Sequence, residues 1–160
     1  MGRIVVGVDG SDGSRRALLW AAEEATLRGA SVEVIHTYEH HLAWQGYGGY
    51  GADESMSAAA VEAIRQEIES AAREAAKHAQ ALVDQMVEGL DGPEVTGMAV
   101  ESSRPADTLI EHSKGADLLV VGSRGRGGFK SLMLGSVSQQ CAQHAECPVV
   151  IIRSKPEEQA

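Results

Sequence analysis

Short apolar runs alternate with segments of helical periodicity along the whole sequence, and this alternation restricts the possible folds more than any other feature. The apolar runs are residues 4–8, 31–37, 94–100, 117–121 and 147–152. The pattern between them predicts helices over residues 15–28, 54–88, 103–113 and 131–144. Strands that alternate with helices form parallel sheets through right-handed crossovers. We therefore expect an α/β fold with a five-stranded, doubly wound parallel sheet and helices on both faces.

The length and composition fit one compact domain of this kind. A chain of 160 residues can bury a sizeable core, and 43% of its residues are hydrophobic. Aromatic residues make up only 4%, so the core must consist mainly of Val, Ile, Leu and Ala, as in parallel sheets covered by helices. We assign residues 1–154 to this domain and residues 155–160 to a polar tail.

Charge and segment lengths exclude several classes of protein. The net charge of -9 argues against nonspecific binding to nucleic acid, which needs a basic surface. No apolar run approaches the roughly 20 residues of a membrane-spanning helix, and the first run begins too early to leave room for a signal peptide. The two cysteines, Cys141 and Cys147, are too few for a disulfide framework. We expect a cytoplasmic protein that binds neither nucleic acid nor a membrane.

A glycine-rich segment follows the fourth expected strand, with the spacing Gly-x2-Gly-x9-Gly-Ser at Gly122, Gly125, Gly135 and Ser136. Glycine lets backbone N–H groups approach a phosphate, and a helix N-terminus adds partial positive charge. Simple turn geometry is the alternative reason for the first two glycines. Gly135 would weaken a helix that started at residue 131 by about 1 kcal/mol, which points to a contact or to a helix start near Gly135. The segment also carries three cations, which either meet an anion or belong to a solvated loop: Arg124, Arg126 and Lys130.

Asp9 ends the first expected strand, and Gly122 follows the fourth. In a sheet of strand order 3-2-1-4-5, the order reverses between these two strands, and ligands bind beyond the carboxyl ends of strands at such a point. The two segments therefore share one crevice in the expected fold. The Asp9 carboxylate is suited to accept hydrogen bonds from a ribose diol. Its alternative role is the N-cap of the following helix, for which Ser11 and Asp12 are also suited.

Several segments resemble the universal stress protein family, in its ATP-binding branch, and the resemblance extends over nearly the whole chain. Besides the glycine spacing, they are Val-Gly-Val-Asp-Gly-Ser at 6–11, Val-Ile-His-Thr at 34–37, Arg-Pro-Ala-Asp-Thr-Leu at 104–109, Gly-Ala-Asp-Leu-Leu-Val-Val-Gly at 115–122 and His-Ala-Glu-Cys-Pro-Val-Val-Ile-Ile at 144–152. The main departure is a Gly/Tyr-rich loop at 46–51, whose role is open.

The resemblance implies specific contacts and an assembly. It implies adenosine contacts at Val8, Asp9, Thr37 and Val121. It implies phosphate contacts at Gly122, Arg124, Gly125, Gly135, Ser136, Val137 and Ser138. It also implies a homodimer in which the last strands of two subunits pair, and an apolar edge strand at 149–152 would need such cover.

The leading hypothesis is an ATP-binding regulatory protein in which bound nucleotide controls conformation or a partner interaction. Magnesium could bridge the phosphates, because it needs few protein ligands, and we assign no metal ligand to the chain. No residue in the crevice has the character of a strong general base, so we assign no catalytic residue. The family resemblance implies slow ATP hydrolysis at most.

Two other functional classes stay open at this point. One is an enzyme that hydrolyses ATP or transfers its phosphoryl or adenylyl group, and the other is a nucleotide-free dimeric interaction module. The sequence has no Gly-x4-Gly-Lys-Ser/Thr, which excludes a P-loop enzyme, and no Gly-x-Gly-x-x-Gly after the first strand, which weighs against a dinucleotide oxidoreductase. ATP, ADP, AMP and cyclic nucleotides are not distinguished by the residues.

Overall fold

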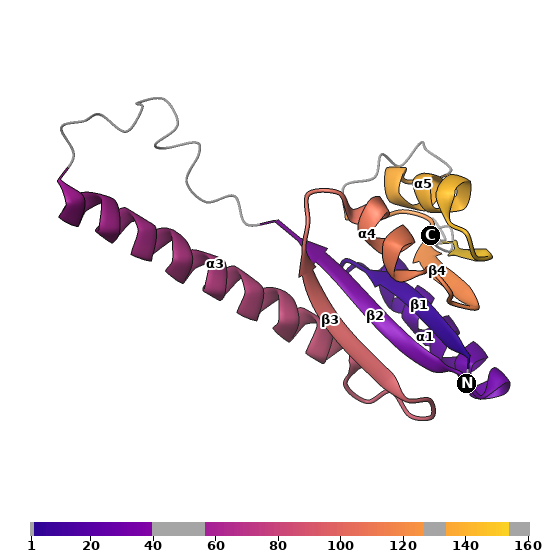
Figure 1. The fold of residues 1–160 in the computed structure, drawn as a ribbon. Helices are drawn as coiled ribbons and strands as arrows, with labels where there is room; N and C mark the ends of the chain where they lie inside the picture. The colour runs from indigo at the N-terminus through magenta and orange to yellow at the C-terminus, as the bar shows by residue number, and fades with distance from the viewer. Residues whose placement is uncertain (1, 40–56, 127–133, 154–160) are drawn as a thin grey trace, which may run out of the picture.

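Five parallel strands form one sheet in the order β3-β2-β1-β4-β5 (Figure 1), which confirms the expected fold class and strand order. The structure, a computed structural model, describes residues 2–39, 57–126 and 134–153. The strands are β1 (Arg3–Val8), β2 (Ser31–Tyr38), β3 (Val95–Glu101), β4 (Leu118–Gly122) and β5 (Val149–Ile152). The helices of this part of the chain are α1 (Asp12–Arg28), α3 (Ala58–Val87), α4 (Pro105–His112) and α5 (Ser136–His144). The loop at 46–51, Lys130 and the tail at 155–160 lie outside the described residues.

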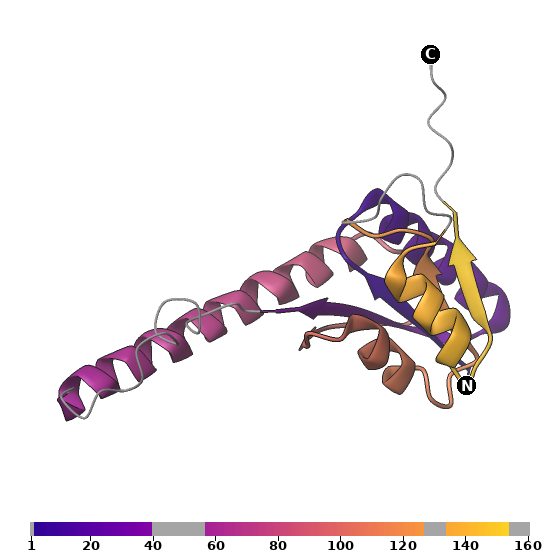
Figure 2. The same ribbon diagram turned by 90° about the horizontal axis from the view of Figure 1, so that it is seen from above.

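The helices cover both faces of the sheet. Helices α1 and α3 lie on one face and α4 and α5 on the other (Figure 2), and each pair encloses its own core cluster. The central strands β1 and β4 are apolar at nearly every position because both of their faces are covered. Ile4, Val5 and Val6 of β1 and Leu119 and Val120 of β4 have no exposed surface.

The ends of the helices follow the local chemistry of the sequence. Ser11 is the N-cap of α1, since its side chain accepts a hydrogen bond from the Ser14 N–H, so the N-cap role that we left open for Asp9 is wrong. Gly29 ends the same helix in the left-handed conformation, with a φ of 63°. Pro105 opens α4, where its missing N–H costs nothing.

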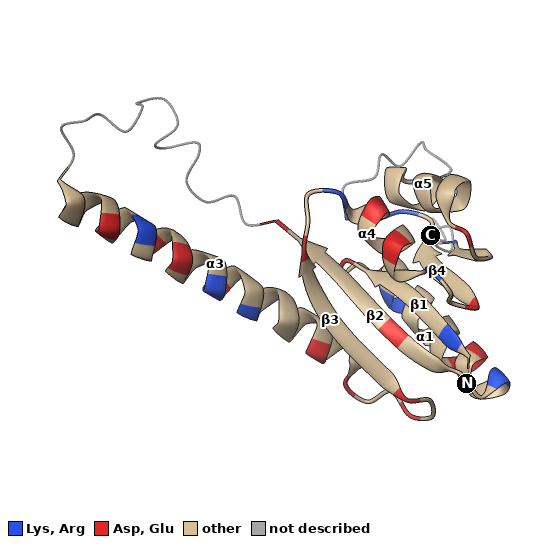
Figure 3. Ribbon diagram, viewed as in Figure 1, with Lys and Arg blue, Asp and Glu red and all other residues tan. Residues whose placement is uncertain are grey.

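Helix α3 extends well beyond the sheet. It runs over Ala58–Val87 rather than the expected 54–88, after the N-cap Ser57. Its buried residues lie in its last third, at Ala79, Val83 and Met86. The first turns project away from the sheet (Figure 1) and alternate in charge (Figure 3). There Arg65 forms ion pairs with Glu62 and Glu69, which support an exposed helix by a few tenths of a kcal/mol each.

The side chain of Gln80 on α3 substitutes for a neighbouring strand at the outer edge of β3. Its Nε2 donates a hydrogen bond to the Gly97 carbonyl at 3.2 Å, and its Oε1 accepts one from the Ala99 N–H at 3.0 Å. These two backbone groups belong to an edge strand, whose open hydrogen-bonding groups invite association with another chain. Gln80 therefore covers part of one edge of the sheet.

We expect Gln80→Ala to lower the free energy of unfolding by about 1–2 kcal/mol, because two part-buried hydrogen bonds are lost. Gln66→Ala is the matched control, since Gln66 lies on the same helix and its side chain donates to the exposed Glu62 carboxylate instead of to the edge of β3. Urea unfolding of the two variants measures the difference. Equal destabilisation by both substitutions would contradict the edge role of Gln80.

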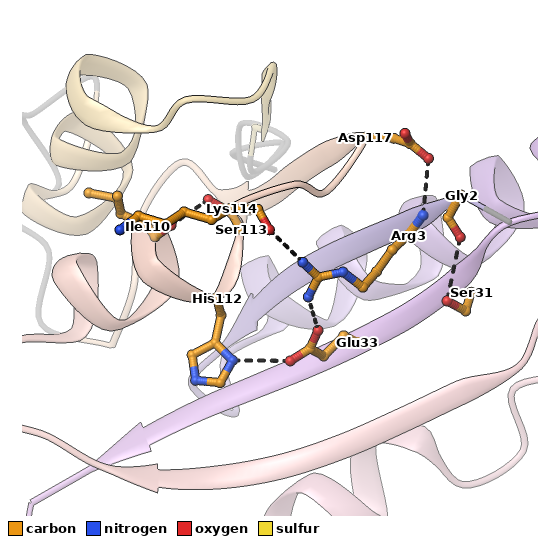
Figure 4. Close-up of polar contacts among 9 residues, drawn as sticks. All are labelled: Gly2, Arg3, Ser31, Glu33, Ile110, His112, Ser113, Lys114 and Asp117. Carbon is orange, nitrogen blue, oxygen red and sulfur yellow. Dashed lines mark hydrogen bonds and ion pairs between the residues drawn. The ribbon is translucent and has the colours of Figure 1, made fainter.

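A polar network joins β1, β2 and α4 at the amino ends of the strands (Figure 4). The Arg3 guanidinium pairs with the Glu33 carboxylate and also donates to the Lys114 carbonyl at 2.8 Å. The other oxygen of Glu33 lies 3.0 Å from Nδ1 of His112, the last residue of α4. The network holds the C-terminal end of α4 against the sheet, which places the opposite end of this helix at the carboxyl ends of β1 and β2.

Candidate functional site

A pocket of about 580 Å³ lies at the carboxyl ends of β1 and β4, where the strand order reverses. It is lined by all eleven residues singled out from the sequence: Val8, Asp9, Thr37, Val121, Gly122, Arg124, Gly125, Gly135, Ser136, Val137 and Ser138. Arg126, another of the three cations noted in the glycine-rich segment, also lines the pocket. Residues separated by more than a hundred positions in the chain therefore surround one cavity.

The N-terminus of α5 faces this pocket. Gly135 is its N-cap and Ser136 its first residue, so the helix begins at the later of the two positions considered. The first N–H bonded within the turn is that of Gln139, which donates to the Gly135 carbonyl at 3.0 Å. The N–H groups of the preceding turn, at 136–138, have no acceptor within the helix and make its start a natural anion site.

The hydroxyl of Ser138 is engaged in hydrogen bonds within the protein. It lies 3.1 Å from the Ser123 carbonyl and 2.9 Å from the Gly135 carbonyl, to which it donates. The Gly135 N–H donates to the same Ser123 carbonyl at 2.7 Å. These bonds hold the start of α5 against the residue that follows β4. Ser136, by contrast, is exposed at the pocket.

Close approach, not turn geometry, explains Gly122 and Gly125. Neither has the positive φ that favours glycine, unlike Gly10 with a φ of 80°. A Cβ on Gly125 would lie 2.6 Å from Oδ2 of Asp9, and a Cβ on Gly122 would lie 3.2 Å from the carbonyl carbon of Gly13. The first distance is shorter than any ordinary side chain allows, and the second is tight enough that the backbone of Gly13 would have to shift. Glycine is therefore needed here for contacts within the protein, a reason that the sequence did not reveal.

The Asp9 carboxylate is surrounded by hydrogen-bond donors. Its Oδ1 accepts from the Ser11 N–H at 3.0 Å and from the Ser11 hydroxyl at 2.5 Å. Its Oδ2 accepts from the Arg126 N–H at 2.9 Å. Burial raises the pKa of this carboxyl, but the bonds from Ser11, together with those from Ser14 and Arg126, outweigh burial and leave the pKa below its ordinary value of 3.8. Asp9 is thus held as an anion at neutral pH.

The lowered pKa predicts a pH dependence of stability. A carboxyl whose pKa is lower in the folded state stabilises the fold above its unfolded pKa, and this contribution is lost as the pH falls through the folded pKa. We expect the difference in unfolding free energy between wild type and Asp9→Asn to shrink from about pH 6 to about pH 3. Urea unfolding across this range measures it. A difference that stays constant or grows toward acid pH would contradict the assignment.

The pocket has an apolar wall that the sequence analysis missed. Ile35 of β2 and Pro105 and Leu109 of α4 line it, with Gly7 and Ser14. A Cβ on Gly7 would lie 2.6 Å from Cδ1 of Leu109, so this glycine lets α4 pack closely over β1. The position of α4 depends on tertiary packing between residues that are distant in the sequence. Gly7 is the local sequence feature that could have indicated this close packing.

Charged groups of both signs line the cavity at Asp9, Arg124 and Arg126. Within residues 2–39, 57–126 and 134–153, no three His, Cys, Asp or Glu side chains are grouped so that they could hold a metal ion. Among the helices described, none is both long and apolar enough to cross a membrane.

A model described as the universal stress protein family matches residues 1–153. The chain belongs to the universal stress protein family. A universal stress protein of Thermus aquaticus is 33% identical over 152 residues, which cover 94% of this chain and 97% of that relative. One from Mycobacterium tuberculosis is 32% identical over 150 residues, with 94% of this chain covered but 47% of the relative. The chain thus spans about half the length of several curated universal stress proteins that it matches.

Solved universal stress protein structures share the fold. One, in complex with cAMP, is 25% identical with a TM-score of 0.59 and covers 96% of this chain and 98% of its own. Another, from Archaeoglobus fulgidus in complex with dAMP, is 25% identical with a TM-score of 0.53 and covers 95% of this chain and 98% of its own. Adenine nucleotides are therefore ligands of members of this family.

Proposed function

We propose that this universal stress protein binds ATP in the pocket between β1 and β4 and uses it to regulate conformation or a partner interaction. One observation carries the proposal: an apolar wall, two arginines and the start of α5, which has no side-chain cap, line one cavity of about 580 Å³. Apolar walls with a few convergent polar groups are typical of small-molecule sites. The cAMP and dAMP complexes of family members support an adenine nucleotide as the ligand class.

Each end of the pocket suits one part of such a ligand. Ile35 and Leu109 offer an apolar surface to a planar base. The N–H groups at the start of α5 suit a phosphate, since a helix N-terminus favours negative charge. Arg124 and Arg126 add positive charge beside it, in a chain whose net charge is -9. Further phosphates of ATP would extend toward these arginines. Mg²⁺ would neutralise part of the charge of these phosphates, since this ion retains waters and needs few protein ligands.

The same site supports retention of the nucleotide more than its turnover. The carboxylate that lines the pocket, Asp9, is engaged by Ser11 and Arg126 and has a lowered pKa, which makes it a weak base. We therefore propose a regulatory role with slow hydrolysis at most.

We further propose that the protein acts as a homodimer through β5. Gln80 covers part of the β3 edge, whereas β5 forms the other edge and its four apolar residues are only half-buried. A second β5 would pair with this edge and cover those side chains. Both Cys141 and Cys147 are free thiols, which fits a reducing compartment, and we propose that the dimer acts in the cytoplasm.

Extraction of nucleotide from purified protein tests the proposed function. The protein is denatured, the supernatant is analysed by ion-exchange chromatography, and the emptied protein is refolded and titrated with ATP, ADP, AMP and cAMP. We expect a bound adenine nucleotide and saturable binding of ATP. If no nucleotide copurifies and none binds in the titrations, the result would favour a nucleotide-free interaction module. Rapid multiple turnover would favour the enzyme alternative.

A further inference from the structure

We propose that Asp9 is a positioning residue, which holds the glycine loop at 122–126 to the end of β1. It would then affect nucleotide affinity by keeping the phosphate-binding groups of this loop and of α5 in place, and not by contacting the ribose. This inference rests on the proposed function and departs from the expected role of Asp9 as a ligand of the ribose diol. It follows from the hydrogen bonds of the carboxylate, from the position of Gly125, and from the contact between the loop and α5.

The Asp9 carboxylate has little capacity left for a ligand. A carboxylate offers about four acceptor positions. Both bonds at Oδ1 come from Ser11, the N-cap of α1, and a bond at Oδ2 comes from the Arg126 N–H. Three positions are thus occupied by the protein itself. A diol, which donates through two hydroxyls, finds at most one acceptor position here.

Gly125 restricts the remaining position on Oδ2. The place that a Cβ on Gly125 would take lies 2.6 Å from this oxygen, so the backbone of the loop lies directly against it. The Arg126 N–H occupies the same oxygen at 2.9 Å. Oδ2 therefore serves as the contact between β1 and the glycine loop, more than as a surface for ribose.

The loop in turn lies against the start of α5. The place that a Cβ on Gly135 would take lies 3.5 Å from Cα of Arg124 and 3.8 Å from the Gly125 nitrogen. The Ser123 carbonyl also accepts the Gly135 N–H at 2.7 Å. A loop released from Asp9 would no longer hold the N–H groups of α5 and the loop arginines in one arrangement. The effect of Asp9 on binding should then depend on whether the ligand carries phosphates.

Asp9→Asn separates the two roles. In this variant the amide oxygen can still accept hydrogen bonds from Ser11, and the amide NH2 can still donate to a ribose oxygen. The NH2 group cannot accept a hydrogen bond from the Arg126 N–H. Asp12→Asn is the control, because Asp12 is an exposed carboxylate on the first turn of α1. The affinities of wild type and both variants are measured by calorimetry for ATP, 2′,3′-dideoxy-ATP and adenosine. Amide hydrogen exchange of residues 123–126 is measured without added nucleotide.

We expect Asp9→Asn to weaken ATP and 2′,3′-dideoxy-ATP equally, each by about tenfold, as for the loss of a hydrogen bond to a charged group. The affinity for adenosine should fall by less than about threefold. The Arg126 amide hydrogen should exchange faster than in the wild type. A loss that is present with ATP and absent with dideoxy-ATP would assign Asp9 to the ribose and overturn the inference. Unchanged exchange of the Arg126 amide would also overturn it. If wild-type protein binds none of the phosphorylated ligands, the proposed function fails, while the exchange data still decide the loop contact.

Discussion

Gly125→Ala should lower the affinity for ATP by about 10- to 100-fold, the largest loss we expect from a single methyl group at the pocket. The new Cβ would lie 2.6 Å from Oδ2 of Asp9, a distance that forces the carboxylate or the loop to move. We expect either movement to weaken the bond between Asp9 and the Arg126 N–H. Calorimetric titration with ATP measures the loss, and circular dichroism checks that the fold is retained.

Gly135→Ala is the matched control for that prediction. Gly135 has a φ of -76°, which alanine adopts without strain, and the nearest atom to its new Cβ would be 3.5 Å away. The substitution thus adds the same methyl group beside the same loop without a clash. We expect a loss of affinity several-fold smaller than for Gly125→Ala. Equal losses would show that steric contact with Asp9 is not the cause.

Leu119→Ala should lower the free energy of unfolding by about 2–5 kcal/mol, the largest effect we expect on stability. Leu119 lies on β4, an interior strand of the sheet, has no exposed surface, and belongs to the core cluster under α4 and α5. Its truncation removes apolar contacts and leaves a cavity that neighbouring strands cannot fill. Urea unfolding at neutral pH measures the change.

Leu27→Ala provides the comparison, because Leu27 on α1 is 83% exposed and its truncation opens no cavity. Surface substitutions of this kind change stability by about 0.5 kcal/mol or less. Similar destabilisation by Leu119→Ala and Leu27→Ala would contradict the placement of β4 in the interior of the sheet.

The sheet and one half of the pocket were predictable from the sequence for a simple reason. Buried parallel strands are nearly continuous apolar runs, and the strand order then brings the residue after β1 next to the residue after β4. Asp9 and Gly122 could therefore be placed together without a structure. The start of α5 was also predictable in part, because a glycine inside a helix weakens it.

What could not be predicted depends on packing between distant elements. The apolar wall from α4 requires the close contact of Gly7 with Leu109 and the anchoring of His112 by Glu33, and neither pair has a sequence pattern. The boundaries of α3 also differed, since only its last third is held by the sheet. The hydrogen bond from the Arg126 N–H to Asp9 involves a backbone group, which no side-chain motif records.

The central claim is that the start of α5 and the glycine loop hold the phosphates of an adenine nucleotide. A titration of isotope-labelled protein with Mg²⁺-ATP, followed by amide NMR, tests it most directly. We expect saturable shifts that are largest at the amides of Gly125, Ser136, Val137 and Ser138, and no comparable shifts with adenosine. ATP that leaves these amides unshifted at saturating concentration, or that shifts chiefly the amides of α3, would contradict the claim.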